Sequence, residues 1–114
     1  CTASQLAALA VLEKGESWLS GAVDSYRDAG YAAADRLGLE RPQGGTFLFI
    51  DVADYLDDRG LQGFMLDCIE RGLILAPGGS CGTDYQGYVR LCFTSAPPDV
   101  VGRGVEVLAG LLGR

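Results

Sequence analysis

The sequence contains no histidine and a single lysine, Lys14. A chain without histidine forms neither a Ser-His-Asp nor a Cys-His catalytic arrangement, and it lacks the side chain that most often exchanges protons near neutral pH. Zinc sites with a histidine ligand are excluded for the same reason. These absences rule out most self-contained hydrolases.

Positive charge is scarce as well. The chain carries 9 lysines and arginines against 15 aspartates and glutamates, which gives a net charge of −6. Nucleic acids and anionic membranes are bound by clustered lysine and arginine, so we expect neither as a partner. No apolar run approaches the ~20 residues that span a bilayer. With 48% apolar residues, the sequence predicts a single folded domain over residues 1–114.

The four cysteines, Cys1, Cys68, Cys81 and Cys92, include no Cys-x-x-Cys pair, and their spacing matches no zinc-ribbon pattern. We therefore expect no metal site and a reduced, cytoplasmic protein. The chain begins without methionine and without the basic stretch of a signal peptide, so we interpret its start as an excision point or a processed end.

The hydrophobic pattern predicts the order helix, helix, strand, helix, strand, strand, helix. Apolar residues recur at helical spacing over the first forty residues, with an interruption at Gly15, and again over residues 61–71 and 98–112. Strands are predicted at residues 46–52, 73–76 and 87–94. This order is typical of an α+β fold with a small three-stranded sheet covered by helices. We expect a helical interdomain-type segment, residues 1–41, followed by an α+β unit, residues 42–114.

The first predicted strand is apolar on both sides. Phe47 and Phe49 point one way, and Leu48, Ile50 and Val52 point the other. A strand of this kind requires cover on both faces. Because the chain has few helices for that purpose, we expect a partner domain.

Arg90 is the candidate site residue. It lies in the last predicted strand, and alternation places it on the same face as Tyr88 and Cys92. A guanidinium away from water requires an anion. Its planar set of donors suits a carboxylate, which it binds through two parallel hydrogen bonds. The alternative is a structural arginine at the sheet edge, paired with Asp51, Asp84 or solvent.

Other segments give weaker hypotheses. The glycine-rich loop of residues 77–82 lacks the lysine and the following helix of a phosphate-binding loop, which favours a tight turn. Cys81 in that loop is either a reactive thiol or a plain small side chain, and no neighbouring cation favours the thiol. Cys68 and Cys92 are expected to pack in the core. The acidic segment 51–58 supplies paired carboxylates for acid–base catalysis, binds a hard cation, or is only a solvated connecting segment. The last of these interpretations is favoured.

Four segments, read in order, resemble the C-terminal part of the fold-type I, pyridoxal-phosphate-dependent aminotransferases of class I/II. SQLAALA at residues 4–10 is similar to the segment soon after the cofactor lysine, and GGTFLFID at 44–51 to the "GGxFxxxD" strand. CIERGLILAPG at 68–78 looks like the "xxGVxVxPG" passage, and GYVRLCF at 87–93 like the "xxRLSF" strand. The resemblance covers essentially the whole chain.

The resemblance implies a small domain that closes over a pyridoxal 5′-phosphate site and binds the α-carboxylate of an amino-acid or 2-oxo-acid substrate through Arg90. In that family the cofactor lysine and the phosphate-binding groups belong to the large domain, and Lys14 does not match the cofactor-lysine motif. The resemblance thus implies no catalytic and no cofactor-binding residue in this chain, and no activity without a large domain in cis or in trans. It also implies a homodimer for the complete enzyme.

Two points stay open. Relatives commonly carry an aromatic residue in the "PGSxFG" loop, where this sequence has Cys81, so the size of the substrate is undetermined. Decarboxylase, β-lyase and oxidase chemistry occur on the same fold. The second hypothesis for the whole chain is a free-standing, non-enzymatic α+β module that associates with partners through its apolar faces.

Overall fold

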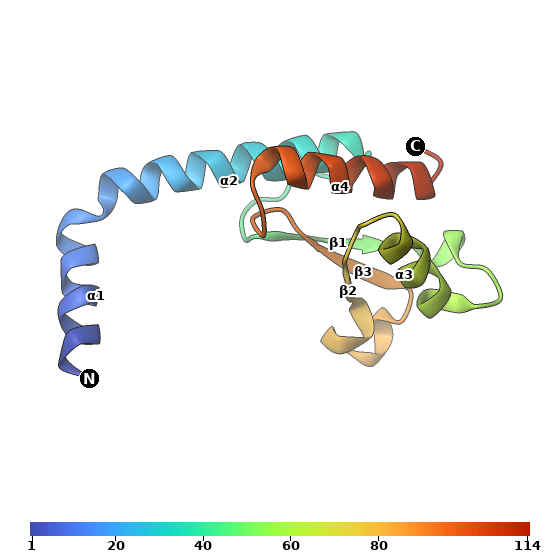
Figure 1. Cartoon of the computed structure of the whole chain (residues 1–114), viewed down its shortest axis with the longest axis horizontal. Coiled ribbons are helices and arrows are strands. Elements are labelled where there is room, and N and C mark those ends of the chain that lie inside the picture. The colour runs from blue at the N-terminus through green and yellow to red at the C-terminus, as the bar shows by residue number, and fades with distance from the viewer.

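The structure of the chain, a computed structural model, describes all 114 residues. Figure 1 shows a small sheet with helices packed on it and a helical extension at the N-terminus. The predicted element order and the α+β fold are confirmed. The elements are α1 (Thr2–Lys14), α2 (Glu16–Arg36), β1 (Phe47–Asp51), the 3-10 helix η1 (Ala53–Tyr55), α3 (Gly60–Glu70), β2 (Ala76–Pro77), the 3-10 helices η2 (Gly78–Cys81) and η3 (Thr83–Tyr85), β3 (Tyr88–Cys92) and α4 (Pro98–Leu111).

The sheet has the strand order β1-β3-β2, and both pairings are antiparallel. Its central strand is β3, the last along the chain. Arg90 stands opposite Phe49 on β1 and opposite Ala76 on β2. The candidate residue therefore lies in the middle of the sheet rather than at its edge.

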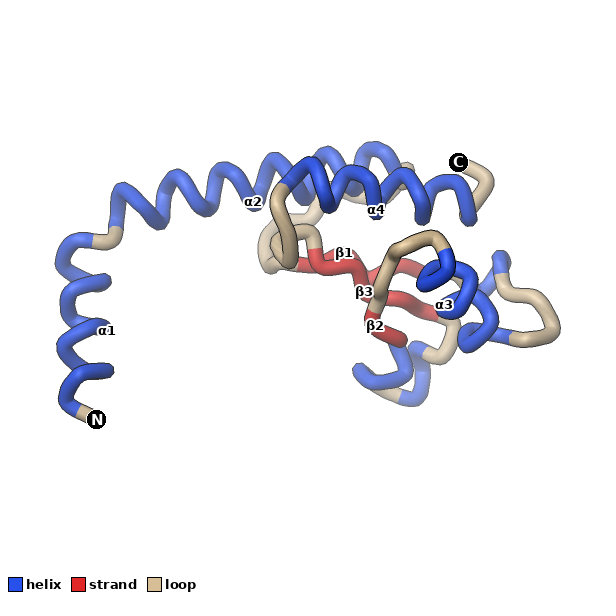
Figure 2. The backbone as a smooth tube through the Cα atoms, viewed as in Figure 1, coloured by secondary structure: helices blue, strands red, loops and turns tan.

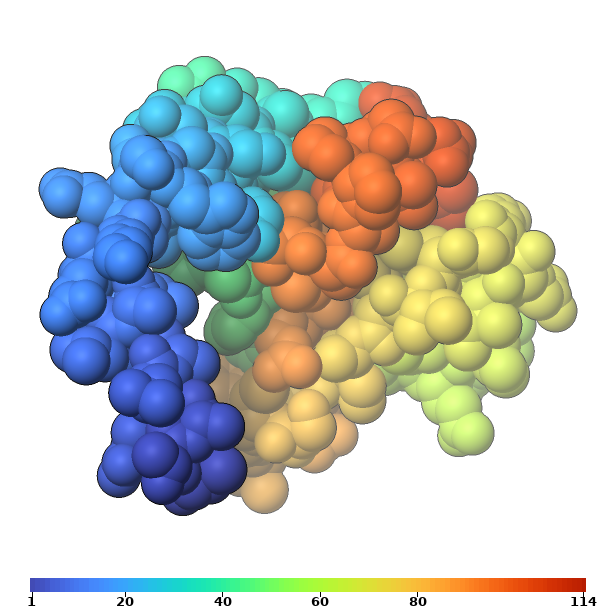
Figure 3. Space-filling model, turned by 60° about the vertical axis from the view of Figure 1, so that its left-hand side comes forward, coloured from blue at the N-terminus to red at the C-terminus, as the bar shows by residue number.

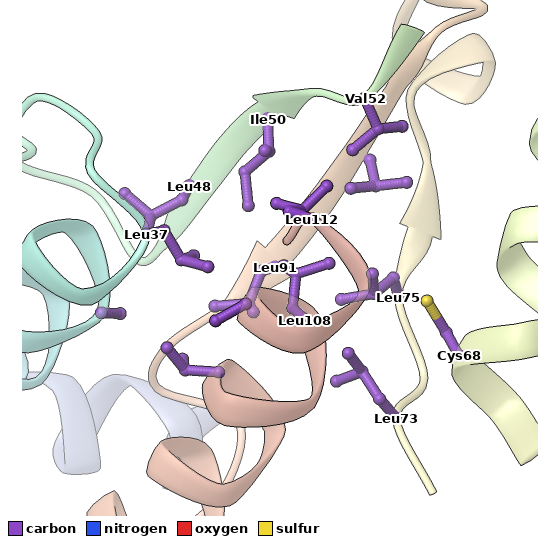
Figure 4. Close-up of a cluster of buried hydrophobic side chains, with 14 of the residues drawn as sticks. Leu37, Leu48, Ile50, Val52, Cys68, Leu73, Leu75, Leu91, Leu108 and Leu112 are labelled. Carbon is purple, nitrogen blue, oxygen red and sulfur yellow. The ribbon is translucent and has the colours of Figure 1, made fainter. Parts of the chain in front are cut away.

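One face of the sheet forms the core. Helices α2 and α4 run side by side on this face, and α3 packs against α4 (Figure 2). Alternate residues of β1 and β3 are buried here, as the period of two in a strand requires. Figure 4 shows the side chains meeting between the sheet and α4. The main contributors are Leu48, Ile50, Val89 and Leu91 from the sheet, Ala33, Ala34 and Leu37 from α2, Phe64 and Cys68 from α3, and Val105, Leu108 and Leu112 from α4 and its end.

The opposite face of the sheet, called the open face below, carries Phe47, Phe49, Tyr88, Arg90 and Cys92. All five are partly or fully exposed. The cover that the sequence predicts on both faces of β1 is thus complete on one face only within this chain. On the open face, Tyr85 of η3 packs on Phe49 and Tyr88, and no helix or strand covers the rest. The expectation of a partner domain refers to this face.

The N-terminal helices form an arm that leaves the body of the molecule. We use "helical arm" for residues 2–26. Helix α1 buries no residue and stands apart from the body in Figure 1, and Figure 3 shows a gap between the arm and the body. The Cα radius of gyration is 16.9 Å, whereas a compact chain of this length has one of about 13 Å. None of the helices is both long and apolar enough to cross a membrane. The exposed apolar side chains of the arm are Leu6, Leu9, Val11, Leu12, Trp18, Leu19, Val23 and Tyr26.

The prediction of a strand at residues 73–76 is largely wrong. Gly72, with a φ of +80°, ends α3, and the amide of Leu73 returns to the carbonyl of Cys68 at 2.9 Å. Leu73 and Leu75 then enter the core, and Ile74 between them is 82% exposed. The alternation is therefore that of a strand, but only its last residue pairs with β3.

The predicted loop at residues 77–82 is also more regular than expected. Pro77 belongs to β2, and Gly78–Cys81 forms a 3-10 turn in which Ser80 Oγ donates to the carbonyl of Pro77 at 2.7 Å. Gly78 is required here, because a Cβ at this position would lie 2.5 Å from the carbonyl oxygen of Tyr85.

Candidate functional site

Arg90 occupies the centre of the open face. Its side chain is half-buried, and its guanidinium carbon lies over the ring of Phe47, 5.1 Å from the ring centroid. Burial of Val89 and Leu91 on either side turns Arg90 to the open face, as the alternation of the sequence predicts. Tertiary structure thus presents one cation on a surface that is otherwise mostly aromatic.

Arg90 is the only arginine of the chain whose donors have no partner. The other seven make an ion pair or donate a hydrogen bond, whereas Arg90 does neither. The alternative was an edge arginine paired with Asp51, Asp84 or solvent. Its edge position does not hold, because β3 is the central strand, and no ion pair joins Arg90 to either aspartate. The half-buried side chain does reach solvent. The other pairs are Arg27 with Asp24, Arg36 with Glu106, Arg41 with Asp35, Arg59 with Asp57 and Asp67, Arg71 with the carbonyl of Asp67, Arg103 with Asp99, and Arg114 with the carbonyl of Leu37.

A cavity of about 710 Å³ borders Arg90 between the chain segment 71–76 and the start of α4. Arg71, Arg90 and Arg103 all line it, and its lining includes no aspartate or glutamate. The lining of this cavity is therefore positively charged, although the chain as a whole has a net charge of −6. The surroundings of Arg90 therefore favour an anion over a cation.

Three further aromatic rings form a cluster on the open face. Phe49 stacks on Tyr88 with centroids 5.0 Å apart, and Tyr85 meets both rings edge-on at 5.0 and 5.5 Å. A hydrogen bond to Asp51 and the charge of that carboxylate raise the pKa of the Tyr88 hydroxyl above its ordinary value. The sequence indicated the face of Phe49 and Tyr88, but Tyr85 was missed because it comes from a separate turn, η3.

Cys92 is exposed on the open face, so the expectation that it packs in the core is wrong. It lies two residues after Arg90, and alternation puts both on one face. Its Sγ is 3.5 Å from Thr94 Oγ1. That hydrogen bond, helped by the charge of Arg90, holds the pKa of the Cys92 thiol below its ordinary value. Cys68 is buried as expected, and burial raises the pKa of its thiol to about 11.

The remaining candidate residues lie away from Arg90 or are already paired. Lys14 is exposed in the last turn of α1, on the helical arm (Figure 1). Cys81 is exposed on η2, with its Sγ 3.9 Å from Ser80 Oγ. Asp57 of the acidic segment is bound by Arg59, which also binds Asp67 of α3, and these hydrogen bonds lower the pKa of each carboxyl.

The side chains of this chain do not fit a pyridoxal phosphate site. Its one lysine stands on the helical arm, away from the open face, and no cluster of cysteine, aspartate and glutamate side chains suits a metal ion. What the chain offers is a single anion-binding side chain on an aromatic surface. The arrangement can orient a carboxylate.

No model of a known protein family and no curated protein matches the sequence. The chain resembles solved structures, among them two aminotransferases. LysN, an α-aminoadipate aminotransferase from Thermus thermophilus complexed with N-(5′-phosphopyridoxyl)-L-leucine, superposes with a TM-score of 0.68 and 21% identity, over 90% of this chain and 30% of LysN. An aminotransferase from Mycobacterium tuberculosis gives a TM-score of 0.66 and 20% identity, over 86% of this chain and 27% of that protein.

The chain has the fold of part of an aminotransferase. It spans less than a third of the length of either enzyme. At about 20% identity the likeness establishes the fold, which agrees with the resemblance that the four sequence segments carry.

Proposed function

We propose that this chain is the small domain of a pyridoxal-phosphate-dependent aminotransferase of fold type I, and that Arg90 binds the α-carboxylate of the amino-acid or 2-oxo-acid substrate. The observation that carries the proposal is the free guanidinium of Arg90. It stands in the central strand, on the open face of the sheet, and it is the one arginine whose N–H donors have no protein partner. The fold around it is that of part of an aminotransferase.

Arg90 contributes to such a reaction by binding and orientation. Two parallel N–H donors that bind one carboxylate fix both its position and its plane. Holding the carboxylate in this way restricts rotation of the substrate, so that the bond to be broken at the α-carbon keeps one direction. When bound, pyridoxal phosphate supplies the electron sink for that bond cleavage. Closure of the small domain would exclude water from the ion pair and so strengthen it.

The cofactor must be bound by other residues, which the proposal assigns to a large domain in cis or in trans. Two features support such a partner. The matched aminotransferases are more than three times as long as the part they share with this chain. The chain also exposes 7473 Å², about 1,500 Å² more than a compact protein of its mass. One partner in a typical stable interface buries about 800 Å². We further propose that the complete enzyme is a cytoplasmic homodimer.

The decisive experiment joins the chain to a large domain in one polypeptide, or mixes the two as separate chains. We expect visible absorbance from the bound cofactor and turnover of an amino acid. Arg90→Ala then raises KM for the amino acid by about 10- to 100-fold, because charge-assisted hydrogen bonds are lost. The matched control is Arg41→Ala, since the donors of Arg41 already bind Asp35 at 2.7 and 2.8 Å. Equal KM values for the wild type and Arg90→Ala would show that the role of Arg90 is wrong.

A further inference from the structure

We propose that Phe47 is a positioning residue for Arg90: its ring holds the guanidinium by a cation–π contact while leaving every N–H donor free for the incoming carboxylate. This inference rests on the proposed function for the identity of the ligand. The contact between Phe47 and Arg90 itself does not depend on that function, and it can be tested separately.

The sheet register brings the two side chains together. Phe47 pairs with Cys92 and Phe49 pairs with Arg90, so Phe47 is the diagonal neighbour of Arg90 on the same face. Diagonal neighbours lie within reach of one another when one is aromatic and the other long. The separation of 5.1 Å between the guanidinium carbon and the ring centroid is inside the ~6 Å limit of a cation–π contact. No hydrogen bond or ion pair holds the guanidinium of Arg90.

An aromatic ring can hold the Arg90 guanidinium without occupying its N–H donors, whereas a carboxylate side chain cannot. A carboxylate partner occupies the N–H donors of an arginine, as Glu106 does at Arg36 with distances of 2.7 and 2.8 Å. An aromatic ring attracts the guanidinium through its π face and accepts none of those in-plane donors. Arg90 is thus held in place without losing its capacity to bind a planar anion.

Elsewhere in this chain, another arginine contacts an aromatic ring and binds a carboxylate at the same time. Arg41 lies over the ring of Tyr31, 5.0 Å from its centroid, and at the same time binds both carboxylate oxygens of Asp35 at 2.8 and 2.7 Å. Arg90 over Phe47 reproduces the ring contact at nearly the same distance, with the carboxylate position left for a ligand. The local pair shows that one guanidinium accommodates both partners together.

Phe47 is also well placed for a clean test. It lies at the start of β1 on the open face and is 47% exposed, so it is not part of the core. Phe49 is a matched control on the same strand and the same face. Its ring packs on Tyr85 and Tyr88 instead of on Arg90.

The first measurement uses the 114-residue chain without a ligand. Nitrogen-15 relaxation of the arginine side chains reports the mobility of the Arg90 Nε–H bond. We expect Phe47→Leu to increase that mobility, Phe47→Tyr to preserve it because the ring remains, and Phe49→Leu to leave it unchanged. If Phe47→Leu does not fold, Phe47→Met gives the same comparison. Unchanged mobility in the variant without a ring, or an equal increase in Phe49→Leu, overturns the inference.

The second measurement uses the complete enzyme. Loss of a partly exposed cation–π contact corresponds to a rise in KM for the amino acid of about two- to fivefold, with kcat nearly unchanged and with recovery in Phe47→Tyr. A KM for Phe47→Leu equal to that of the wild type overturns the positioning role. Failure of the proposed function looks different: Arg90→Ala would then leave KM unchanged, while the effect of Phe47→Leu on the mobility of Arg90 would remain.

Discussion

The two faces of the sheet differ although they are built from alternate residues of the same strands. On β3, Val89 and Leu91 enter a core closed by α2, α3 and α4, whereas Tyr88, Arg90 and Cys92 face outward. The core face contains no buried polar or charged residue. The open face contains the one unpaired arginine and an aromatic cluster. One face therefore provides the stability of this fold, and the other carries side chains that the packing of the core does not use.

Replacement of neighbouring residues on β3 tests this division most strongly. Leu91 is 4% exposed in the core. We expect Leu91→Ala to lower the free energy of unfolding by ~2–5 kcal/mol, because it removes apolar contacts and leaves a cavity. Arg90→Ala, one residue away, should change it by no more than about 0.5 kcal/mol. Urea unfolding of both variants measures the difference, and a similar loss in each would contradict the division.

The two thiols give a second comparison of the faces. Burial raises the pKa of Cys68 to about 11, and the pKa of the exposed Cys92 lies below its ordinary value of 9.0. Two pKa units correspond to about a hundredfold difference in thiolate, the reactive form. At mildly alkaline pH we expect Cys92 to react with a small alkylating reagent at least about 100-fold faster than Cys68 in the folded chain.

Mass spectrometry of peptides after pulsed labelling measures both rates in one sample. In concentrated urea the two rates should become similar, since the tertiary environment that separates them is lost. Comparable rates in the folded protein would show that Cys92 is not on an accessible face.

Two glycines of α2 compare the core side with the helical arm. A Cβ at Gly30 would lie 3.0 and 3.1 Å from the buried ring of Phe93, whereas a Cβ at Gly21 would meet nothing within 4 Å. Both substitutions to alanine gain helix propensity of about 1 kcal/mol. Overpacking costs about 1–3 kcal/mol at Gly30 alone. We therefore expect Gly30→Ala to be less stable than Gly21→Ala by that margin in thermal and urea unfolding, and equal stabilities would contradict the tight packing.

The smallest effect is expected from the ion pair between α2 and α4 at the outer surface. Hydrogen bonds from Arg36 hold the pKa of Glu106 below its ordinary value of 4.5. As the pH falls, Glu106 is therefore protonated in the unfolded chain before it is protonated in the folded chain. Its contribution to stability begins to be lost below pH ~4.5 and is fully lost once the pH is below its pKa in the folded state. Because the pair is exposed, the contribution is small.

The test compares urea unfolding midpoints at neutral and acidic pH. Glu106→Gln should lose slightly less stability on acidification than the wild type does. Glu40→Gln is the control, since Glu40 is exposed and forms no ion pair. An acid response of Glu106→Gln identical to that of the wild type would show that the pair contributes nothing.

Much of the fold follows from local patterns in the sequence. The apolar spacing of residues 61–69 predicts α3, and the turn after it begins at Gly72 as the sequence indicates. Strand alternation gives the correct face for Arg90, Phe47 and Phe49. These features were predictable because each depends on residues close together in the chain, where the helix period of 3.6 or the strand period of two is visible.

Features that depend on distant residues were not predictable. The segment 73–76 has the alternation of a strand, but its pairing with β3 is decided by how Leu73 and Leu75 enter the core. For Cys92, strand alternation predicts the face of Arg90, whereas the apolar character of the side chain predicts the core. Its exposure is decided by α2 and α4, which cover the opposite face of the sheet. The contact of Phe47 with Arg90 requires the register between β1 and β3, which no local pattern contains.

The sequence by itself determined the element order, the α+β fold class and the face on which Arg90 lies, because all three are written in short-range periodicity. It also excluded catalysis by a histidine of this chain, because these 114 residues contain none. Only the tertiary structure decided that β3 is the central strand, that one face of the sheet is uncovered and that Arg90 is held by a ring with its donors free. Those properties arise where residues far apart in the sequence meet, and that meeting is set by packing of the whole core.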